Sequence, residues 1–469
     1  MLSRDYAGAI FERTDARRAL AEEVGRVLEG NAGLTAEERI VRLEVPAGDL
    51  DPLRWLGSQV MRPRSFWSGR EDGTAVAAVG VADVVEGDGT APDASLRERL
   101  ALLSSGARYY GGLRFDPERG ADEEWGAFGA HRFVLPRFEL LRRGDEATLA
   151  CNLVLPRDAE RAGELLDELE GLTVPEGWPG SDGPLPTPVS RVDRPDRAGW
   201  GENVRSALEA FEAGRMDKVV LARRVDLGFG EDLDAVSLME TLREATPGCF
   251  HFLVEPEDGA AFLGASPERL FRREGRGISS EAVAGTRPRG ASEVDDAELR
   301  EELLGSAKDQ AEHSIVRVSI EESLGALCRE LKVEDRASEM KLARGRHLVS
   351  RIRGILREGV SDADVLAALH PTPAVGGYPK GEAIGEIRAL EPFDRGWYAG
   401  PIGWIGADGA EFAVGIRSGL VRGGRLSLYS GAGIVVGSTP DGEWAEIEQK
   451  ISDFTRVFGL DPEERDARA

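Results

Sequence analysis

The order of strand-like and helix-like segments is the feature that most constrains how this chain can fold. Strand patterns follow one another without intervening helices over residues 65–155, and again over residues 250–289 and 397–418. Apolar residues at helical spacing lie in separate blocks, chiefly at residues 15–28, 157–172, 200–211, 296–331, 361–370, 379–390 and from 440 onward. Strands and helices therefore do not alternate as parallel sheets require. The pattern predicts an α+β fold with large, mainly antiparallel sheets.

Length, charge and cysteine usage exclude several classes of function. The chain has 469 residues and a formal net charge of −25, which argues against a nucleic-acid backbone or an anionic membrane surface as partner. The longest apolar run, residues 75–85, is too short to cross a bilayer, and the first residues show no signal-peptide pattern. The three cysteines lack CxxC spacing and read as reduced core residues. We expect a cytoplasmic protein, a monomer or weak homodimer, without nucleic-acid or membrane partners.

Lysine is rare in this chain, and this makes each lysine informative. Only positions 218, 308, 332, 341, 380 and 450 carry it, so nearly all of the 59 basic residues are arginine. Guanidinium stays charged, whereas an amine can lose its proton. A lysine can therefore mark a place where a compact or deprotonatable amine is needed. The alternative is that genome composition alone explains the arginine bias.

The segment from Gly431 to Lys450 brings glycines and charged residues together where an apolar strand meets a helix. Thr439 and Pro440 are typical of a helix cap and first turn. On that helix Glu443, Glu446 and Lys450 follow at spacings of three and four, so they share one face. A solvated face with one ion pair is the commoner explanation of such a triplet.

A second pair of acids has the same spacing. Asp309 and Glu312 lie three residues apart in the helical block 296–331, whose buried side is predicted to carry Leu299, Leu303, Leu304, Ala307, Ala311, Ile315 and Val318. If the two acid pairs faced each other, their oxygens would suit Mg²⁺. A chain with 84 acids contains many such pairs by chance, so spacing alone favours solvated faces.

Other candidates are single residues with ordinary alternatives. Lys218 begins an apolar strand and could be a general base or a strand-capping surface lysine. Glu268 follows a Ser-Pro turn and could be a general acid or a turn carboxylate that accepts backbone N–H groups. His313 and His370 could line a site, although a lone histidine more often has a core or surface role. Zinc, serine-hydrolase and nucleotide-phosphate motifs are not found.

Taken together, these segments resemble the chorismate-utilising enzymes. Seven motifs follow one another in the order of that family: Asp217–Arg223 (DKVVLAR), Gly264–Leu270 (GASPERL), Ala284–Gly290 (AGTRPRG), Lys308–His313 (KDQAEH), His370–Ala374 (HPTPA), Tyr398–Trp404 (YAGPIGW) and Gly431–Lys450. The match covers roughly residues 60–460 and is similar to the isochorismate synthases within the family. Chance agreement over so many ordered motifs is improbable.

The resemblance implies a fold and a domain organisation. Two stacked, largely antiparallel sheets would enclose the site, with helices on the outside. Residues 61–462 would form one domain, in which the Pro- and Gly-rich stretch 174–198 is an internal loop, although its composition alone also fits a domain boundary. Residues 1–60 would be an N-terminal extension packed on this domain, and residues 463–469 a charged tail.

The resemblance also implies roles for individual residues. Glu312 and Glu446 would bind Mg²⁺ directly, with Asp309 and Glu443 acting through water. Lys218 would be the base that activates water for attack at C2 of chorismate, and Glu268 the acid that protonates the departing C4 hydroxyl. To act as a base, Lys218 must be partly neutral, which burial or nearby cations would favour. The substrate-binding residues would be Gly285, Thr286, His313, Ala374, Tyr398, Arg417, Gly431, Ala432, Gly433 and Lys450.

Relatives within the family differ in the attacking nucleophile and in later steps. Anthranilate and aminodeoxychorismate synthases use ammonia and generally lack a lysine at the position of Lys218. Salicylate synthases share it but go on to eliminate pyruvate, and the small residues Ala374 and Val375 favour stopping at isochorismate. The length and two N-terminal motifs, Tyr110–Pro117 (YGGLRFDP) and Phe133–Arg137 (FVLPR), are more similar to the menaquinone branch than to the siderophore branch. A non-catalytic binding protein on the same fold is a remote alternative, which would require a broken site.

Overall fold

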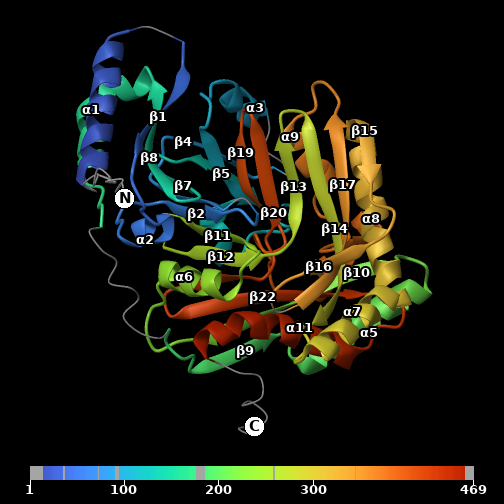
Figure 1. Cartoon of the computed structure of the whole chain (residues 1–469). Helices are drawn as coiled ribbons and strands as arrows, with labels where there is room; N and C mark the ends of the chain where they lie inside the picture. Colours follow the sequence, from blue (N-terminus) through green and yellow to red (C-terminus); the bar gives the residue numbers. More distant parts are fainter. Residues whose placement is uncertain are drawn as a thin grey trace, which may run out of the picture.

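Two antiparallel sheets organise the molecule. The computed structural model describes residues 14–34, 37–71, 73–89, 94–175, 185–256, 259–343 and 345–459. Within these ranges the strands form a 12-stranded and a 10-stranded sheet. In Figure 1 the strands of the second sheet stand upright above the lower strands of the first, and the predicted α+β architecture is confirmed.

The first sheet combines strands from both ends of the chain. Its strands, in spatial order, are β1 (Arg39–Pro46), β8 (Glu146–Leu155), β7 (Phe138–Arg143), β3 (Thr74–Val79), β2 (Arg64–Ser68), β11 (Phe250–Glu255), β12 (Ala261–Ser266), β21 (Ser418–Arg422), β22 (Arg425–Ile434), β10 (Lys218–Gly228) and β18 (Gly377–Tyr378), with β9 (Ser190–Arg194) also paired to β10. Strand β1 pairs with β8 along its whole length. The described part of the first 60 residues is thus continuous with this sheet.

The second sheet contains the long strand β14 (Gly277–Pro288), in which the pairing register shifts at a glycine. Its strands, in spatial order, are β15 (Cys328–Val333), β17 (Gly345–Leu356), β14 (Gly277–Pro288), β13 (Arg269–Glu274), β20 (Gly409–Val414), β19 (Pro401–Gly406), β5 (Arg108–Leu113), β6 (His131–Leu135) and β4 (Asp83–Gly87), with β16 (Ser338–Lys341) paired to β17. Strand β14 has a register shift between Ala284 and Thr286. The residue between them, Gly285, has a φ of 70°, a conformation that glycine adopts at little cost.

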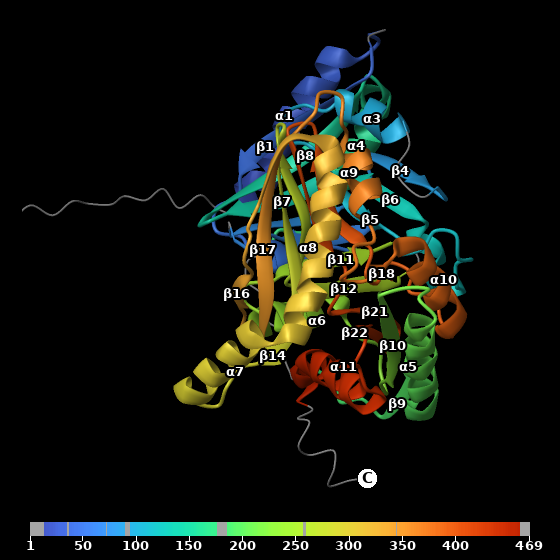
Figure 2. The same cartoon turned by 90° about the vertical axis from the view of Figure 1, so that its right-hand side faces the viewer.

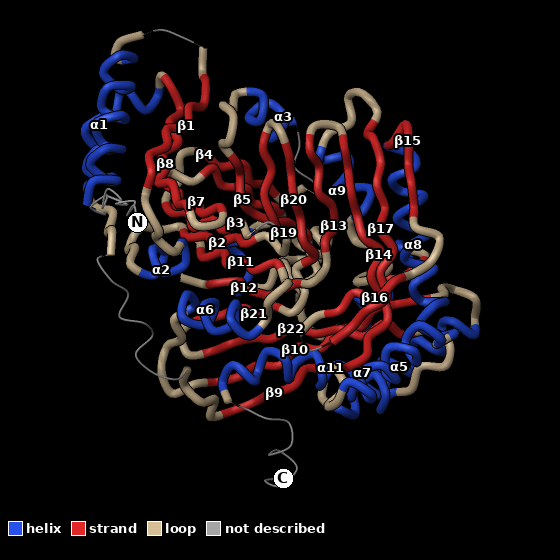
Figure 3. The backbone as a smooth tube through the Cα atoms, in the orientation of Figure 1, coloured by secondary structure: helices blue, strands red, loops and turns tan. Residues whose placement is uncertain are grey.

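The helices lie on the outside of the sheets, as Figure 3 shows by colour. They are α1 (Thr14–Asn31), α2 (Pro52–Gly57), α3 (Ala94–Ala101), α4 (Ala162–Glu170), α5 (Arg197–Glu212), α6 (Ala235–Ala245), α7 (Glu293–Gly305), α8 (Ala307–Leu327), α9 (Asp362–Leu369), α10 (Lys380–Leu390) and α11 (Pro440–Thr455). Figure 2 shows α8 lying along β14 and β17, and α11 and α5 side by side against β22 and β10. Among the described residues, none of these helices is long and apolar enough to cross a membrane.

One predicted helix is wrong in its extent, and its predicted buried face is confirmed at Leu303 on α7 but is wrong on α8. The block 296–331 is two helices, because Ser306 ends α7 and its hydroxyl caps α8 by accepting from the backbone N–H of Asp309 at 3.2 Å. The chain leaves the helix at Cys328 and continues as strand β15. The change at Ser306 also resets the buried stripe, which on α8 consists of Asp309, His313, Val316, Ile320 and Leu324.

The predicted Pro- and Gly-rich loop is also shorter than expected at its C-terminal end. Residues 190–194 form strand β9, which pairs with β10. Residues 176–184 of that segment, like the predicted tail 463–469, lie outside the described residues. The segment that can be described therefore contributes an edge strand to the first sheet.

Candidate active site

A polar cavity of about 200 Å³ lies where the two sheets meet. We call it the reaction cavity. It is lined by residues of β10 and β22 from the first sheet, β14 and β17 from the second, and helices α8 and α11. Segments more than two hundred residues apart in the sequence therefore share one wall.

Lys218 and Glu312 form the innermost contact. Lys218 is fully buried at the start of β10, and its Nζ lies 2.9 Å from Oε1 of Glu312 on α8. Gly433 on β22 covers this pair: a Cβ there would lie 2.6 Å from Glu312 Oε1 and 3.2 Å from Lys218 Cε. The glycine is therefore needed so that strand and ion pair can approach each other.

The N-terminal turn of α8 holds the other acid of that helix. Asp309 is buried, and its Oδ2 accepts a hydrogen bond of 2.8 Å from Arg287 on β14. Gly285 lies against it, since a Cβ at that glycine would be 3.1 Å from the Asp309 side chain. His313, one turn further along α8, turns away to the carbonyl of Ala282 at 3.2 Å, and burial lowers its pKa.

Helix α11 presents the acid pair that the sequence predicts. It begins at Pro440 after the cap Thr439, whose hydroxyl accepts from the N–H of Gly442 at 3.2 Å. Lys450 Nζ donates to Glu446 Oε1 at 2.7 Å and to the carbonyl of Gly431 at 2.9 Å. The predicted i, i+4 ion pair is therefore present, and it ties α11 to the glycine strand β22.

Glu443 connects the two acid-bearing helices. Its Oε1 lies 3.2 Å from Nζ of Lys308 on α8. Burial raises the pKa of Glu443, and the neighbouring charge of Glu446 raises it further, whereas Lys450 lowers the pKa of Glu446. The two helices thus do face each other, as the metal hypothesis requires.

The four carboxylates suit Mg²⁺ in kind, although each one contacts a basic side chain. Their oxygen donors are the ligand type that this ion prefers, and the mutual repulsion of Glu443 and Glu446 is one that a cation would relieve. The basic partners are Arg287 for Asp309, Lys218 for Glu312, Lys308 for Glu443 and Lys450 for Glu446. No group of three or more His, Cys, Asp or Glu side chains close enough to share a metal ion occurs in the described parts of the chain.

Glu268 is the protonated carboxyl group of the cavity. It follows β12 in a turn where its backbone N–H donates to the hydroxyl of Ser266 at 3.2 Å. Burial raises its pKa to about 8, with a further contribution from the charge of Glu281, while Lys218 acts in the opposite direction. At neutral pH the group therefore carries the proton that a general acid needs.

Two residues with unusual backbone conformation adjoin the cavity. Ala399, next to Tyr398, and Arg417 have φ angles of 62° and 51°, and they are the only non-glycine residues with positive φ in the described ranges. The carbonyl of Arg417 accepts a hydrogen bond of 3.0 Å from the N–H of Ala265. The ring of Tyr398 stacks on Tyr429 at 5.4 Å between centroids. Such strained backbone persists where the surroundings hold it firmly, which is common at functional sites.

The structure brings most of the predicted site residues together. Those that line the reaction cavity are Glu268, Gly285, Thr286, Asp309, Glu312, Ala374, Tyr398, Arg417, Gly431, Gly433, Glu446 and Lys450. Lys218 and Glu443 lie directly behind it through their ion pairs. His313 and Ala432 are buried and are not part of the lining.

Sequence reasoning missed His347, which lines the cavity from β17. Its Nδ1 lies 3.1 Å from both the carbonyl of Gly285 and the hydroxyl of Thr286. Burial lowers its pKa to about 3, so the ring is neutral. The contact depends on the pairing of His347 with Thr286 across β14 and β17, and no sequence motif records that register. Arg287 and Lys308 were visible in quoted motifs but were not assigned to the site.

Comparisons with known proteins identify the family of the chain. Residues 28–459 match the family described as chorismate binding enzyme. Isochorismate synthase 2, chloroplastic, from Arabidopsis thaliana is 37% identical over 89% of this chain and 80% of its own length. The salicylate biosynthesis isochorismate synthase of Pseudomonas aeruginosa is 36% identical over 88% of this chain and 89% of its own.

A solved structure gives the same result. The menaquinone-specific isochorismate synthase MenF from Escherichia coli superimposes with a TM-score of 0.81 at 31% sequence identity, covering 94% of this chain and 100% of that one. Sequence and fold agree over nearly the whole chain. The protein is therefore a member of the chorismate binding enzyme family.

Proposed function

We propose that the protein is an isochorismate synthase, an isomerase that converts chorismate to isochorismate. One observation carries the proposal: the reaction cavity is lined by a protonated carboxyl group, Glu268, and by basic groups suited to carboxylates, and a buried amine, Lys218, lies directly behind its wall at Glu312. Addition of water and loss of hydroxide need one group that accepts a proton and one that donates it. The names of the relatives, isochorismate synthases from a plant and two bacteria, support the same reaction.

In the proposed mechanism Lys218 is the base. Its amine takes a proton from water as the oxygen bonds to C2 of chorismate, and the two ring double bonds shift away from C2. The C4–O bond then breaks, and Glu268 gives its proton to the departing hydroxyl, which leaves as water. One water enters and one leaves, so product and substrate are isomers. Return of the proton from Lys218 to Glu268 through solvent completes the cycle.

Substrate binding in this proposal depends on local positive charge. Chorismate is a dianion, and the chain as a whole carries a net charge of −25. Arg417 and Lys450 line the cavity and would hold a carboxylate, with the phenol of Tyr398 beside them. Buried, preorganised charges of this kind stabilise an anion more strongly than charges in water do.

We propose Mg²⁺ as the cofactor, held by Glu312 and Glu446 directly and by Asp309 and Glu443 through water. When bound, the ion would supply positive charge for a substrate carboxylate. The basic side chains that now contact these acids would have to give up at least some of those contacts. Lys450 would then be available to the substrate, and Lys218, released from Glu312, could act as the base.

The menaquinone pathway is the proposed setting, because the E. coli relative is menaquinone-specific by name. The P. aeruginosa relative is named for salicylate biosynthesis, so a siderophore or salicylate branch is the second candidate. The small residues Ala374 and Val375 line the cavity and favour release of isochorismate over pyruvate elimination. We also propose a cytoplasmic location, which suits three buried cysteines that form no disulfide bond.

Product analysis tests the proposal. Purified protein is incubated with chorismate and Mg²⁺, and the products are separated by chromatography. Isochorismate is the expected main product. Salicylate with pyruvate would assign the protein to the pyruvate-eliminating branch instead, and the absence of turnover would leave only a binding function.

A further inference from the structure

A second cavity, larger than the first, opens directly beside the reaction cavity. Its volume is about 310 Å³, and we call it the annex. The two cavities share the walls formed by Pro267, Thr286, Arg287, His347, Arg417, Glu446 and Lys450. A ligand in the annex would therefore reach the same basic groups that a substrate carboxylate would use.

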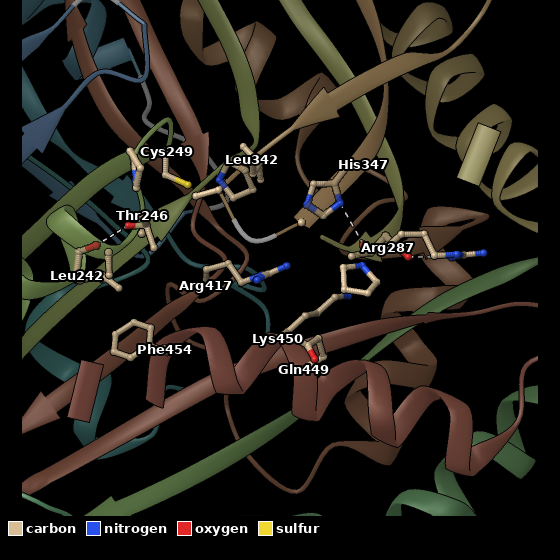
Figure 4. A pocket seen from close by; sticks show the side chains of 18 of the residues that line it. Leu242, Thr246, Cys249, Arg287, Leu342, His347, Arg417, Gln449, Lys450 and Phe454 are labelled. Carbon is tan, nitrogen blue, oxygen red and sulfur yellow. Dashed lines mark hydrogen bonds between the residues drawn. The ribbon is translucent and has the colours of Figure 1, made fainter. Parts of the chain in front are cut away.

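The walls that belong to the annex alone are mainly apolar. They are contributed by the C-terminal end of α6 with Leu242, by Cys249, by Leu342 at the β16–β17 turn and by Phe454 on α11. Figure 4 shows Phe454, Leu242, Thr246 and Cys249 on one side, Leu342 above, and the side chains of Arg417 and Lys450 in the middle. The annex thus has an apolar half and a cationic end, where Arg287, Arg417 and Lys450 outnumber the one acid, Glu446, which pairs with Lys450.

A small dianion such as chorismate gains little binding energy from the apolar half of the annex. Water in contact with Leu242, Leu342 and Phe454 is displaced favourably by an apolar body of matching size. The cationic end requires that this body carry an anion. An aromatic ring with one carboxylate meets both demands, because a ring adds much apolar area with few rotatable bonds.

We propose that the annex binds an aromatic carboxylate, with its carboxylate at Arg417 and Lys450 and its ring between Leu342 and Phe454. Because the carboxylate end is shared with the substrate, the ligand excludes chorismate and inhibits competitively. The annex then acts as a feedback site for the class of compound that lies downstream. Elimination of pyruvate from isochorismate leaves an aromatic hydroxycarboxylate, so a reaction that aromatises the product supplies such a ligand. This physiological part rests on the proposed function.

Two matched acids test the chemistry of the site. Benzoate and 2-naphthoate carry the same carboxylate and differ by one ring. We expect 2-naphthoate to bind the full-length protein about tenfold more tightly in isothermal titration calorimetry, since the second ring is buried in the annex. Chorismate should displace it, and inhibition of isochorismate formation should be competitive. Equal affinities, or inhibition that is not competitive, would overturn the proposal.

A substitution in the annex tests its location. Leu342 is half-buried in a turn, and its backbone N–H pairs with the carbonyl of Gly345, so its side chain can be changed without loss of that bond. Leu342→Trp fills the annex and should weaken 2-naphthoate about tenfold while the KM for chorismate stays within twofold. Leu342→Gln should weaken it by a smaller factor through lost apolar contact. The matched control is Leu34→Trp, at a leucine that is 52% exposed. This variant should leave both the affinity for 2-naphthoate and the KM for chorismate unchanged.

The outcomes separate this proposal from the proposed function. Calorimetry does not require turnover. If no isochorismate forms, but 2-naphthoate binds and Leu342→Trp weakens that binding, the proposed function is wrong and the annex proposal is supported. If isochorismate forms and Leu342→Trp leaves 2-naphthoate binding unchanged, the annex proposal is wrong and the function remains.

Discussion

Ion pairs in the scaffold and ion pairs at the site are built from different residues. In the scaffold, Arg137 contacts Asp158 through two nitrogens at 2.6 and 3.2 Å, and Arg273 contacts Asp362 at 2.5 and 2.8 Å. At the site, three of the four acids contact a lysine through a single ammonium group, in the pairs Lys218–Glu312, Lys308–Glu443 and Lys450–Glu446. Half of the six lysines of the chain are thus placed at one cavity.

The difference has a physical meaning. A guanidinium fork fixes the geometry of a carboxylate and cannot be deprotonated, so it suits a permanent contact. An ammonium group makes no such fork and can exchange one partner for another. We infer that the scaffold pairs are structural, whereas the lysine pairs can be exchanged when substrate and metal bind.

Replacement of Lys218 by arginine is expected to have the largest effect. Arg keeps the positive charge beside Glu312 but cannot act as a base, so turnover should fall by about 10²–10⁴-fold. Steady-state assays with chorismate measure the loss, and circular dichroism checks the fold. Retained turnover would mean that Lys218 only neutralises Glu312, and the comparison between the two kinds of pair would lose its main support.

Removal of an arginine from the scaffold should act on stability instead. Arg137→Met leaves the buried carboxylate of Asp158 without its guanidinium and should lower the free energy of unfolding by about 3–5 kcal/mol. Urea unfolding measures this. Arg18→Met is the control, because its pair with Glu22 is 79% and 64% exposed, and it should change stability by at most about 1 kcal/mol. Equal losses in the two variants would contradict a structural role for the bidentate pair.

The sequence predicted the fold and the two acid pairs for different reasons. Strand order without βαβ alternation is a local pattern, and it was sufficient for an antiparallel α+β fold. The spacing of Asp309 and Glu312 matched that of Glu443 and Glu446, but spacing could not show that α8 faces α11. The ordered family motifs supplied that expectation, and the contact between Lys308 and Glu443 confirms that the helices face each other.

What the sequence could not supply depends on long-range register and on competing local signals. His347 reaches the site because it pairs with Thr286, and pairing register is set by the packed sheets. The break at Ser306 was readable, since Ser306 followed by Asp309 is a capping pattern. The prediction instead continued the helical apolar spacing of Leu299 and Leu303 past Ser306, as if the helix were unbroken. This gave the wrong buried face for α8.

Gly433→Ala tests whether the Lys218–Glu312 contact depends on the close approach of the β22 backbone at Gly433. The added Cβ would lie 2.6 Å from Glu312 Oε1, so the carboxylate must move. Displacement of a catalytic group by about 1 Å costs up to about 10²-fold in turnover, and we expect a loss of that order. Gly385→Ala is the matched control, because nothing lies within 4 Å of a Cβ there, and helix α10 should gain up to about 1 kcal/mol. Full turnover in Gly433→Ala would show that the pair tolerates displacement.

The pH dependence tests Glu268, the carboxyl group of the site that remains protonated. Its pKa is raised to about 8, so the acid form needed to protonate the leaving hydroxyl is present below that pH and is lost above it. Turnover should therefore fall about tenfold per pH unit well above pH 8. Rate profiles in the wild type measure this, with circular dichroism confirming the fold at each pH. A pH profile of Glu268→Gln identical to that of the wild type would exclude Glu268 as the acid.

Lys308→Met should have the smallest effect, and it tests partner exchange at its most accessible pair. Lys308 is 46% exposed while Glu443 is 4% exposed, so solvent screening limits the contact to about 1 kcal/mol or less. If Lys308 competes with Mg²⁺ for Glu443, its removal should tighten Mg²⁺ binding by up to about fivefold in calorimetry, and should lower the Mg²⁺ concentration for half-maximal turnover by the same factor. Lys332→Met on β15, a lysine outside the cavity lining, should change neither value. Weaker Mg²⁺ binding in Lys308→Met would mean that the lysine positions Glu443 for the metal, and the pair would then belong with the fixed contacts of the scaffold.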